Sequence, residues 1–376
     1  MKQTVIIFLL LIHTVPCLGQ KKHAATFTKL LNAEIAKENI HNLFLHVHSP
    51  SKEIDFQYAT GSFQNNDTIT PATPFYLASI GKTFTATAIG ILKDQGKLAF
   101  TDKINLHLSE EILDKLHVFE GVDYSNDITI AQLLQHTSGL PDYFEGTTVD
   151  GSPNMMNLLF QHPNKHWKPT ELIQFAKEKM KPLFAAGKGY NYTDTEYVLL
   201  GLIIENISGL ELHDFFKEYI FKSLQLQHTY MNLRSAPIKE TPKMAEIYVG
   251  SYEIATFQSL TADWAGGGLV STTHDLIQFQ KALFNGKLVK RETLKAMQQW
   301  TAETQGMYYG FGLRKVVLQE LSSNFPTLEL IGHSGSTASF LYYCPSLDVY
   351  IAGTLNQVEA NKDALILIAN ILATIH

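Results

Sequence analysis

The sequence predicts an α+β fold in which strands from both ends of the chain form one antiparallel sheet. Strand-like runs gather near the N-terminus and again after residue 309. The stretch between them carries mostly helical spacing with long loops. Short links between the late strands indicate antiparallel hairpins. We therefore expect a sheet flanked by the two terminal helices, with a mostly helical domain inserted in the middle of the 376 residues.

The first elements are a helix and two strands. Residues 24–40 place apolar side chains on one helical face, and residues 43–48 and 54–59 read as strands. His46 and His48 fall on the same face of the first strand, an arrangement that could bind a metal. Because no third ligand is apparent nearby, we interpret them as a structural pair.

Short helical segments follow in the middle of the chain. They cover residues 80–95, 129–135, 170–179, 194–206 and 212–222. A further helix is expected over residues 273–284, because Thr272 and Asp275 have the spacing of a capping box. An apolar run at residues 363–375 predicts a closing helix. The predicted late strands are residues 309–318, 327–333, 337–343 and 349–356.

This order of elements predicts two domains. Residues 20–78 and 258–376 would form the sheet domain, and residues 79–257 the mostly helical one. We expect an active site at the seam between them, because clefts between domains commonly hold ligands.

Composition limits the possible partners. The chain is 45% hydrophobic and 18% charged, which is typical of a globular protein with a substantial core. Its formal net charge is −6 and no run of basic residues occurs, which argues against binding nucleic acid or an anionic membrane surface. We expect a monomer.

The N-terminus resembles an export signal. Lys2 supplies a positive charge, residues 5–12 form an apolar core, and small residues precede a predicted cut at Gln20. We therefore expect residues 1–19 to be a signal peptide and the protein to be periplasmic or extracellular. The apolar core is far shorter than the roughly 20 residues of a membrane span, so no span is expected. Lipid modification of Cys17 is an alternative, although the residues before it match such a site poorly.

The most informative string is Ser79-Ile80-Gly81-Lys82. On a helix, residues three apart share a face, so the Ser79 hydroxyl and the Lys82 amine can meet. A serine hydroxyl becomes nucleophilic when a neighbouring base takes its proton. Taken alone, the string also fits a capped helix with a surface lysine. It does not fit a phosphate-binding loop, because Tyr76 occupies the position of the required first glycine.

Several further strings along the chain support a site around Ser79 and Lys82. Tyr192-Thr193-Asp194 opens a predicted helix, and His333-Ser334-Gly335-Ser336 lies at the end of a predicted strand. Three more segments carry further short motifs. They are Leu133 to Pro141, Gly266 to Thr272, and Tyr309 to Gly312.

Together these strings resemble the serine β-lactamase and penicillin-binding-protein families, over nearly the whole chain after the predicted signal. The resemblance is closest to the branch with class C β-lactamases, D-alanyl-D-alanine carboxypeptidases, D-aminopeptidases and related esterases. It implies a β-lactamase/transpeptidase-like fold. It also implies that Ser79 attacks a carbonyl carbon and becomes acylated, while Lys82 and Tyr192 share proton transfer.

The same resemblance assigns the remaining site residues. His333, Ser334 and Gly335 match the family's triplet on the sheet edge that faces the serine. The backbone N–H groups of Ser79 and Ser336 would form the oxyanion hole. No metal and no cofactor are implied. His136, although a tempting base, belongs to a string that is a structural turn in this family.

Two departures from the family pattern affect the expected chemistry. Asp194 stands where asparagine is common, and a carboxylate beside Lys82 would raise the lysine pKa. Tyr192 would then carry the proton, or Asp194 would turn away or bind a cationic substrate group. His333 stands where most β-lactamases have lysine, which makes a grip on a substrate carboxylate less secure.

The sequence therefore predicts an exported serine hydrolase that works through an acyl-enzyme on Ser79. The expected substrate is a D-amino-acid peptide or a related amide, including a β-lactam. Two alternatives stay open: a carboxylesterase with the same mechanism, and a non-catalytic domain that binds or senses penicillin.

Overall fold

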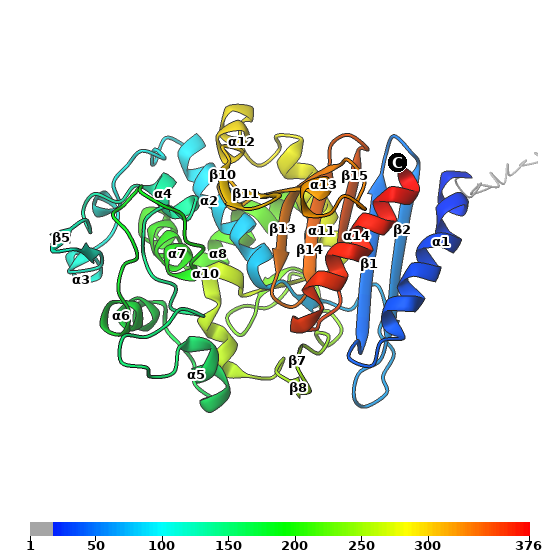
Figure 1. Cartoon of the computed structure of the whole chain (residues 1–376), viewed down its shortest axis with the longest axis horizontal. Coiled ribbons are helices and arrows are strands. Elements are labelled where there is room, and N and C mark those ends of the chain that lie inside the picture. Colours follow the sequence, from blue (N-terminus) through cyan, green and yellow to red (C-terminus); the bar gives the residue numbers. More distant parts are fainter. Residues whose placement is uncertain (1–17) are drawn as a thin grey trace, which may run out of the picture.

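The computed structural model describes residues 18–376, and its centre is a large antiparallel sheet (Figure 1). Strands from the two ends of the chain meet where β15 pairs with β1. The eight strands lie in the following spatial order: β10 (Thr301–Thr304), β11 (Met307–Tyr309), β12 (Arg314–Val317), β13 (Glu329–Gly335), β14 (Ser339–Cys344), β15 (Val349–Thr354), β1 (Asn42–Ser49) and β2 (Ile54–Gly61).

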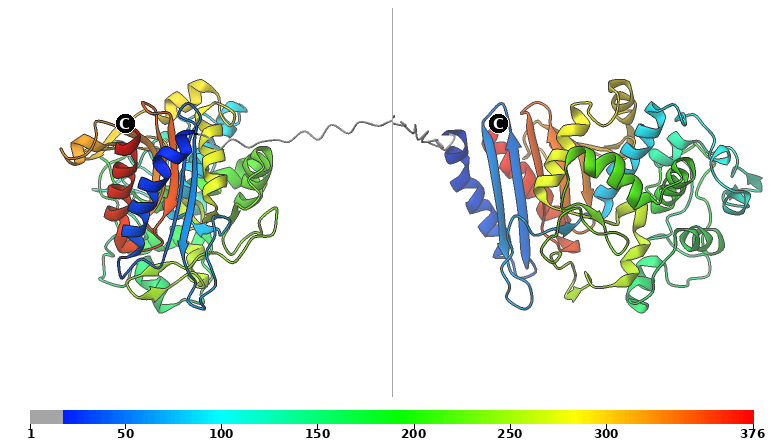
Figure 2. Two further views of the ribbon diagram at one scale, coloured as in Figure 1. Left: turned by 90° about the vertical axis from the view of Figure 1, so that its right-hand side faces the viewer. Right: turned by 180° about the vertical axis from the view of Figure 1, so that it is seen from behind.

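Helices cover both faces of this sheet. The terminal helices α1 (Leu18–Ile35) and α14 (Asn361–Ile375) pack against each other on one face (Figure 1). On the other face, α11 (Thr273–Phe284) packs against β14, β15 and β1, as the view from behind shows (Figure 2). The predicted sheet from both chain ends, with flanking terminal helices, is confirmed.

Burial explains the different residue patterns of β1 and β2. β1 lies inside the sheet between both helix layers, and its side chains are buried on both faces. A strand in that position has a nearly continuous apolar sequence. β2 is the edge strand, and Ile54 and Phe56 are buried while Asp55 and Gln57 are exposed.

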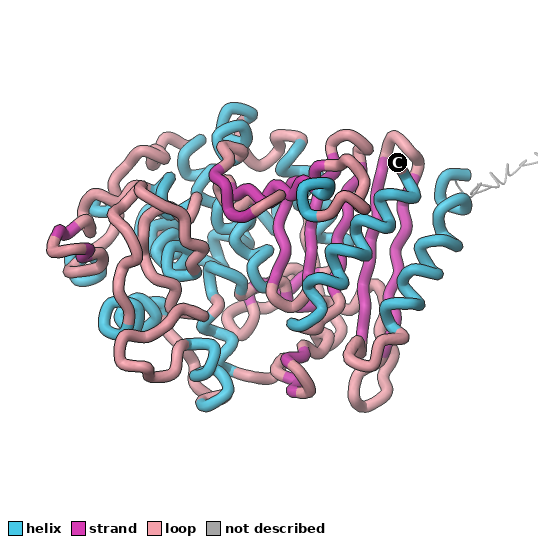
Figure 3. Tube along the Cα trace, in the orientation of Figure 1, coloured by secondary structure: helices cyan, strands magenta, loops and turns pink. Residues whose placement is uncertain are grey.

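The rest of the chain forms the mostly helical side of the molecule, where long loops join short helices (Figure 3). Its central element is α2 (Gly81–Asp94), which is buried from Gly81 to Leu92 and packs against α7 and α10. The other helices are α3 (Glu110–Leu113), α4 (Ile130–Leu134), α5 (Met155–Gln161), α6 (Pro169–Lys179), α7 (Asp194–Ser208), α8 (Leu212–Phe216), α9 (Lys222–Leu224), α10 (Trp264–Gly267) and α12 (Arg291–Met297). The short helix α13 (Leu318–Leu321) instead lies on the sheet side, between β12 and β13.

A small sheet connects the two parts next to the predicted serine. It has the order β3-β9-β6, in which β3 (Phe75–Tyr76) precedes the serine string and β9 (Leu269–Ser271) follows the three glycines. β6 (Tyr230–Met231) is its third strand. The remaining strands form two hairpins, β4 (Val118–Phe119) with β5 (Val122–Asp123), and β7 (Tyr248–Val249) with β8 (Tyr252–Glu253).

One predicted strand is wrong. Residues 309–318 form β11 and β12 with a turn between them, because Gly312 has a φ of +63° and cannot continue a strand. The helix predicted over residues 212–222 is confirmed, with a π-helical turn at Lys217–Phe221 between α8 and α9.

None of the helices among residues 18–376 is long and apolar enough to cross a membrane. The predicted signal peptide, residues 1–19, falls almost wholly outside the described residues. Its cleavage and the exported location therefore stay predictions.

Candidate active site

Ser79 lies in the 3₁₀ turn Ala78–Ile80, immediately before α2. This turn packs against β13 and α10, which fixes it between the large sheet and the helical side. Lys82, in the first turn of α2, places its Nζ 3.1 Å from Ser79 Oγ. Ala78 has a φ of +46°, a left-handed conformation that costs free energy in a non-glycine residue. The surrounding packing therefore holds the serine in its position.

Lys82 is fully buried and has three hydrogen-bond partners. Besides Ser79 Oγ, its Nζ contacts the Asp194 carboxylate and lies 3.1 Å from the carbonyl oxygen of Gly266. An ammonium group has three protons to donate, and each partner accepts one. Burial acts to lower the pKa of Lys82, but Asp194, Tyr192 and Asp263 together outweigh it and raise this pKa above its ordinary value. The lysine is therefore an ammonium in the resting site.

The contact between Lys82 and Asp194 explains why glycine occupies position 266. A Cβ on Gly266 would lie 2.3 Å from Asp194 Oδ1 and 3.5 Å from Lys82 Nζ. No side chain larger than hydrogen can therefore occupy this position without displacing the ion pair. The first glycine of the Gly266-Gly267-Gly268 string thus has a direct role in shaping the site.

Tyr192 completes the group around the serine. It precedes α7, and its ring centroid lies 4.9 Å from Lys82 Nζ. Burial raises the pKa of the Tyr192 phenol, while the charge of Lys82 and a hydrogen bond to Ser79 act against this rise. The structure therefore brings Ser79, Lys82, Tyr192 and Asp194 together.

The end of β13 forms the opposite wall. Ser334, Gly335 and Ser336 line the same cavity as Ser79. A Cβ on Gly335 would lie 2.3 Å from the carbonyl oxygen of Leu77, so glycine permits the close approach of β13 to the serine turn. The family resemblance places the second oxyanion-hole group, the backbone N–H of Ser336, in this wall.

His333 does not line this cavity, although it was predicted to contact substrate. It is 1% exposed, and its ring nitrogens bond to the Tyr309 hydroxyl at 3.0 Å and the Ser334 carbonyl at 2.7 Å. Burial, with the nearby charges of Arg314 and Lys82, holds the pKa of His333 well below its ordinary value. We therefore correct its expected role: His333 is a neutral support behind the wall.

Arg314 supplies the cation at this wall, and the sequence analysis missed it. It lines the cavity from β12 and lies 3.2 Å from Ser334 Oγ. Two hydrogen bonds of 2.7 Å join its guanidinium to the Glu303 carboxylate. Because this paired geometry already neutralises the charge, Arg314 has little attraction left for a substrate carboxylate.

The cavity itself has a volume of about 400 Å³ and is strongly acidic. It is lined by Ser79, Asp142, Phe144, Glu145, Tyr192, Asp194, Asp263, Arg314, Ser334, Gly335, Ser336 and Asn361. Burial and the charge of Asp194 raise the pKa of Asp142 to about 6 and that of Asp263 to about 7. Burial, and after it the charge of Asp194, also raise the pKa of Glu145.

Three of these carboxylates were missed by sequence reasoning. Asp142 follows Pro141 directly and accepts a 2.9 Å hydrogen bond from the Asp194 backbone N–H, so the end of that marker string was a signal for it. Asp263 stands three residues before Gly266 and accepts a hydrogen bond of 2.9 Å from the Tyr76 hydroxyl. Glu145 had no signal in the sequence.

His136 lies outside this cavity. It is fully buried, and its Nδ1 lies 2.5 Å from Glu196 Oε2. Burial also raises the pKa of Glu196 well above its ordinary value, and Glu196 accepts a hydrogen bond from the Ser138 backbone N–H. This arrangement supports the turn at residues 136–140, in agreement with the structural role expected for His136.

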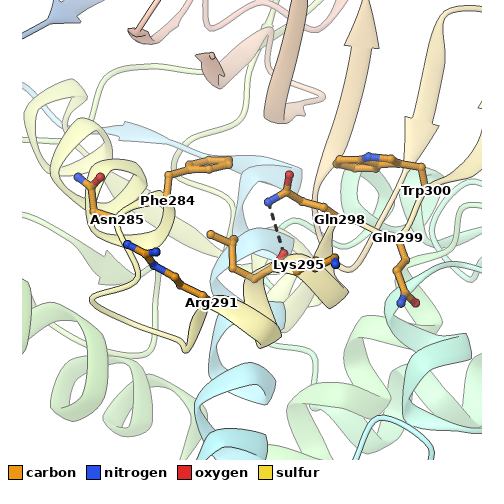
Figure 4. Close-up of a pocket in the computed structure, with 8 residues that line it drawn as sticks. Phe284, Asn285, Arg291, Lys295, Gln298, Gln299 and Trp300 are labelled. Carbon is orange, nitrogen blue, oxygen red and sulfur yellow. Dashed lines mark hydrogen bonds between the residues drawn. The ribbon is translucent and has the colours of Figure 1, made fainter. Parts of the chain in front are cut away.

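A larger cavity, of about 580 Å³, lies beside α11 and α12 (Figure 4). Its wall includes Phe284, Arg291, Lys295 and Trp300, and Gln298 bonds to the Leu294 carbonyl beneath it. None of the predicted catalytic residues lines this cavity, whereas Ser79 and Tyr192 both line the smaller one.

Comparison with known proteins identifies the family. The Beta-lactamase family model matches residues 27–375. Penicillin-binding protein 4* of Bacillus subtilis (strain 168) is 29% identical over 281 residues, which cover 69% of this chain. They cover 55% of that protein, so the chain spans about half the length of this relative.

Solved structures agree on the fold. A D-stereospecific amidohydrolase from Streptomyces sp. aligns with a TM-score of 0.75 at 24% identity, over 92% of this chain and 98% of that one. D-amino acid amidase from Ochrobactrum anthropi SV3, complexed with D-phenylalanine, aligns with a TM-score of 0.77 at 21% identity, over 94% and 98%. The chain belongs to the beta-lactamase family of serine hydrolases.

Proposed function

We propose that the protein hydrolyses an amide of an amino acid or short peptide with a free amino group, through an acyl-enzyme on Ser79. The observation that carries this proposal is the 3.1 Å contact between Lys82 Nζ and Ser79 Oγ at the wall of an acidic cavity. A nucleophile within hydrogen-bond reach of a proton-transfer group is the signature of covalent catalysis.

Asp194 takes part in proton transfer in this proposal. Because Lys82 is an ammonium at rest, it accepts the Ser79 proton only if it passes one of its own to Asp194. The Ser79 oxygen then bonds to the carbonyl carbon, and the carbonyl electron pair moves to its oxygen, where the backbone N–H groups of Ser79 and Ser336 would stabilise it. The proton returns through Lys82 to the leaving amine as the C–N bond breaks. In the second half of the reaction, a water molecule gives a proton to the same Lys82–Asp194 pair and attacks the acyl carbonyl carbon. The ester bond to Ser79 then breaks, and the serine oxygen takes back a proton.

The charge of the cavity favours an amino group on the substrate. Four carboxylates line it: Asp142, Glu145, Asp194 and Asp263. The cationic Arg314 is neutralised by Glu303, so a substrate that must be held by its carboxylate finds no free partner there. This favours an amidase or aminopeptidase over a carboxypeptidase.

An apolar hollow next to this cavity gives room for a substrate side chain. It shares Phe144, Asp263 and Ser336 with the acidic cavity. Its wall is otherwise largely apolar and includes Met156, Leu159, Phe160, Ile247, Ile254 and Phe257. Its volume is about 40 Å³, so a small apolar side chain would bind there. The D configuration is supported by the names of the amidohydrolase and the amidase and by the sequence resemblance.

A substrate panel tests this proposal. We expect D-alanine amide to be hydrolysed faster than its L enantiomer. N-acetylation should lower kcat/KM at least tenfold, because a hydrogen-bonded ion pair contributes about 1.5–3 kcal/mol. A nitrophenyl ester and a fluorescent penicillin serve as general acylation probes. Ester turnover without amide turnover would indicate the esterase alternative, and stable penicillin labelling without turnover would indicate a sensor.

A further inference from the structure

The strand pair at the free edge of the sheet carries a cluster that the proposed reaction does not use. His46 and His48 lie two residues apart on β1, so their side chains share one sheet face. The register pairs His48 with Asp55 of β2, which brings a carboxylate to the same face. In the sequence, no third ligand is apparent near the two histidines. The strand register supplies one.

The three side chains converge closely. Asp55 Oδ1 lies 2.7 Å from His46 Nε2 and 3.3 Å from His48 Nδ1. One ligand atom from each of the three residues lies within 4.8 Å of the others. Ligands of a tetrahedral zinc ion bind at about 2.0–2.2 Å, which places the donor atoms about 3.4 Å from one another. The distances of 2.7 Å, 3.3 Å and at most 4.8 Å lie around this value, so small side-chain movements would complete the site. Asp55 has a side chain that is 63% exposed, so it can rotate to admit an ion.

We propose that His46, His48 and Asp55 form a binding site for a divalent transition-metal ion such as Zn²⁺, which we call the edge site. Two imidazoles and one carboxylate are a donor set that suits zinc, with water as the fourth ligand. A bound ion would link β2 to β1. None of the three residues lines the cavity with Ser79, so the ion would stabilise the sheet edge and leave catalysis unchanged.

The neighbouring helix α11 faces this site with two titratable groups. The His274 ring is stacked near that of His46, with centroids 6.4 Å apart. Lys281 Nζ lies 2.8 Å from His48 Nε2. When a metal binds His48 Nδ1, Nε2 carries a proton and can no longer accept from Lys281, and the dication also repels the ammonium. Lys281 is therefore a competitor whose removal should tighten metal binding.

Calorimetric titration of the full-length protein with Zn²⁺, after treatment with a chelator, tests the edge site. We expect one equivalent to bind and the thermal unfolding midpoint to rise, since a ligand of the folded state stabilises it. His48→Gln and Asp55→Asn should each weaken binding at least tenfold, because even outer-shell changes cost 10–100-fold. Lys281→Gln should strengthen it. His41→Gln, which alters an exposed histidine outside the cluster, is the control and should bind as the unaltered protein does.

Several outcomes would overturn the proposal. They are an absence of saturable binding, equal binding by His48→Gln and the unaltered protein, or weaker binding by Lys281→Gln. Circular dichroism of each variant separates loss of the site from loss of the fold. Hydrolysis of a nitrophenyl ester should be the same with and without zinc.

Discussion

The charge state of Lys82 decides how Ser79 can be activated. In the resting site the three Lys82 protons are donated to Ser79, Asp194 and the Gly266 carbonyl oxygen. Of the possibilities that the sequence left open, the structure excludes one, since Asp194 does not turn away from the lysine. We infer that the lysine and the aspartate work as one proton-transfer pair, in which the carboxylate receives the proton that a free amine would otherwise hold.

Asp194→Asn tests this pair. Asparagine cannot take a proton, and without the Asp194 charge the burial of Lys82 lowers its pKa, so the lysine itself must lose a proton before it can act as a base. With an uncharged nitrophenyl ester we expect kcat/KM to fall by roughly 10²-fold or more at pH values below the new Lys82 pKa, as for a lost acid–base group, and to recover as the pH rises through it. The control is Glu145→Gln, which removes a carboxylate of the same cavity and should change the rate only slightly. A pH profile of Asp194→Asn identical to that of the unaltered protein would show that the carboxylate is not the acceptor.

At this scale the sequence predicted which candidate catalytic groups lie together better than it predicted their surroundings. Ser79, Lys82 and Tyr192 were recognisable because the chemistry needs those residue types at recurring positions in the family pattern. Arg314 was not, because it reaches the cavity only through the turn between β11 and β12 and its pairing with Glu303. Asp263 and Glu145 enter through packing of segments distant in sequence, which no local pattern records.

At the scale of elements, the site depends on segments that cross at very short distances. Leu77 bonds to the Leu269 carbonyl through its backbone N–H, so β3 and β9 hold the serine turn beside the glycine string. Gly266 then presents its carbonyl oxygen to Lys82. The position of the ion pair is thus fixed by backbone packing as much as by side chains.

Gly266→Ala tests this dependence. The added Cβ would overlap Asp194 Oδ1, and we expect ester hydrolysis to fall by at least tenfold because small displacements of reacting groups reduce rates strongly. Gly96→Ala is the matched control. Gly96 has a φ of +72° and open space around it, so alanine there should cost about 1 kcal/mol of stability and no activity. Unchanged hydrolysis by Gly266→Ala would argue against a fixed ion pair.

Elements with a clear apolar period were predicted, and those set by tertiary packing were not. The strands of the sheet centre and the helices α2, α6, α7, α11 and α14 follow their patterns closely. The strands β3, β6 and β9 have two or three residues each, too few for any period to be visible. Helix α5, at Met155–Gln161, lies in a loop region for which the sequence offered no interpretation.

At the scale of the whole molecule, the fold concentrates negative charge where the sheet meets the helices. The division into two domains at residues 79 and 257 stays a prediction, but both parts contribute to the cavity: Ser336 comes from the sheet and Asp142 from the helical side. Bringing carboxyl groups together in this way destabilises their ionised forms. The stability of the molecule should therefore depend on pH.

The sign of this dependence follows from the raised pKa values. Asp142 and Asp263, with pKa values of about 6 and 7, hold protons in the folded state at pH values where the unfolded chain has lost them. Their contribution to the free energy of unfolding is largest near pH 4 and decreases as the pH rises toward 7. Asp263→Asn should reduce this decrease, since asparagine can still accept from Tyr76. Denaturant unfolding between pH 5 and 8 measures it, and an identical slope in the variant would contradict the assignment.

The central claim is that Ser79 carries the acyl group. Its most direct test is mass spectrometry of the protein quenched during turnover of a slowly hydrolysed ester or β-lactam, followed by peptide mapping. We predict an added mass equal to the acyl group on the peptide that contains Ser79, and neither adduct nor hydrolysis in Ser79→Ala, whose stability should change by no more than about 1 kcal/mol. An adduct on another residue, or hydrolysis by a folded Ser79→Ala variant, would contradict the account.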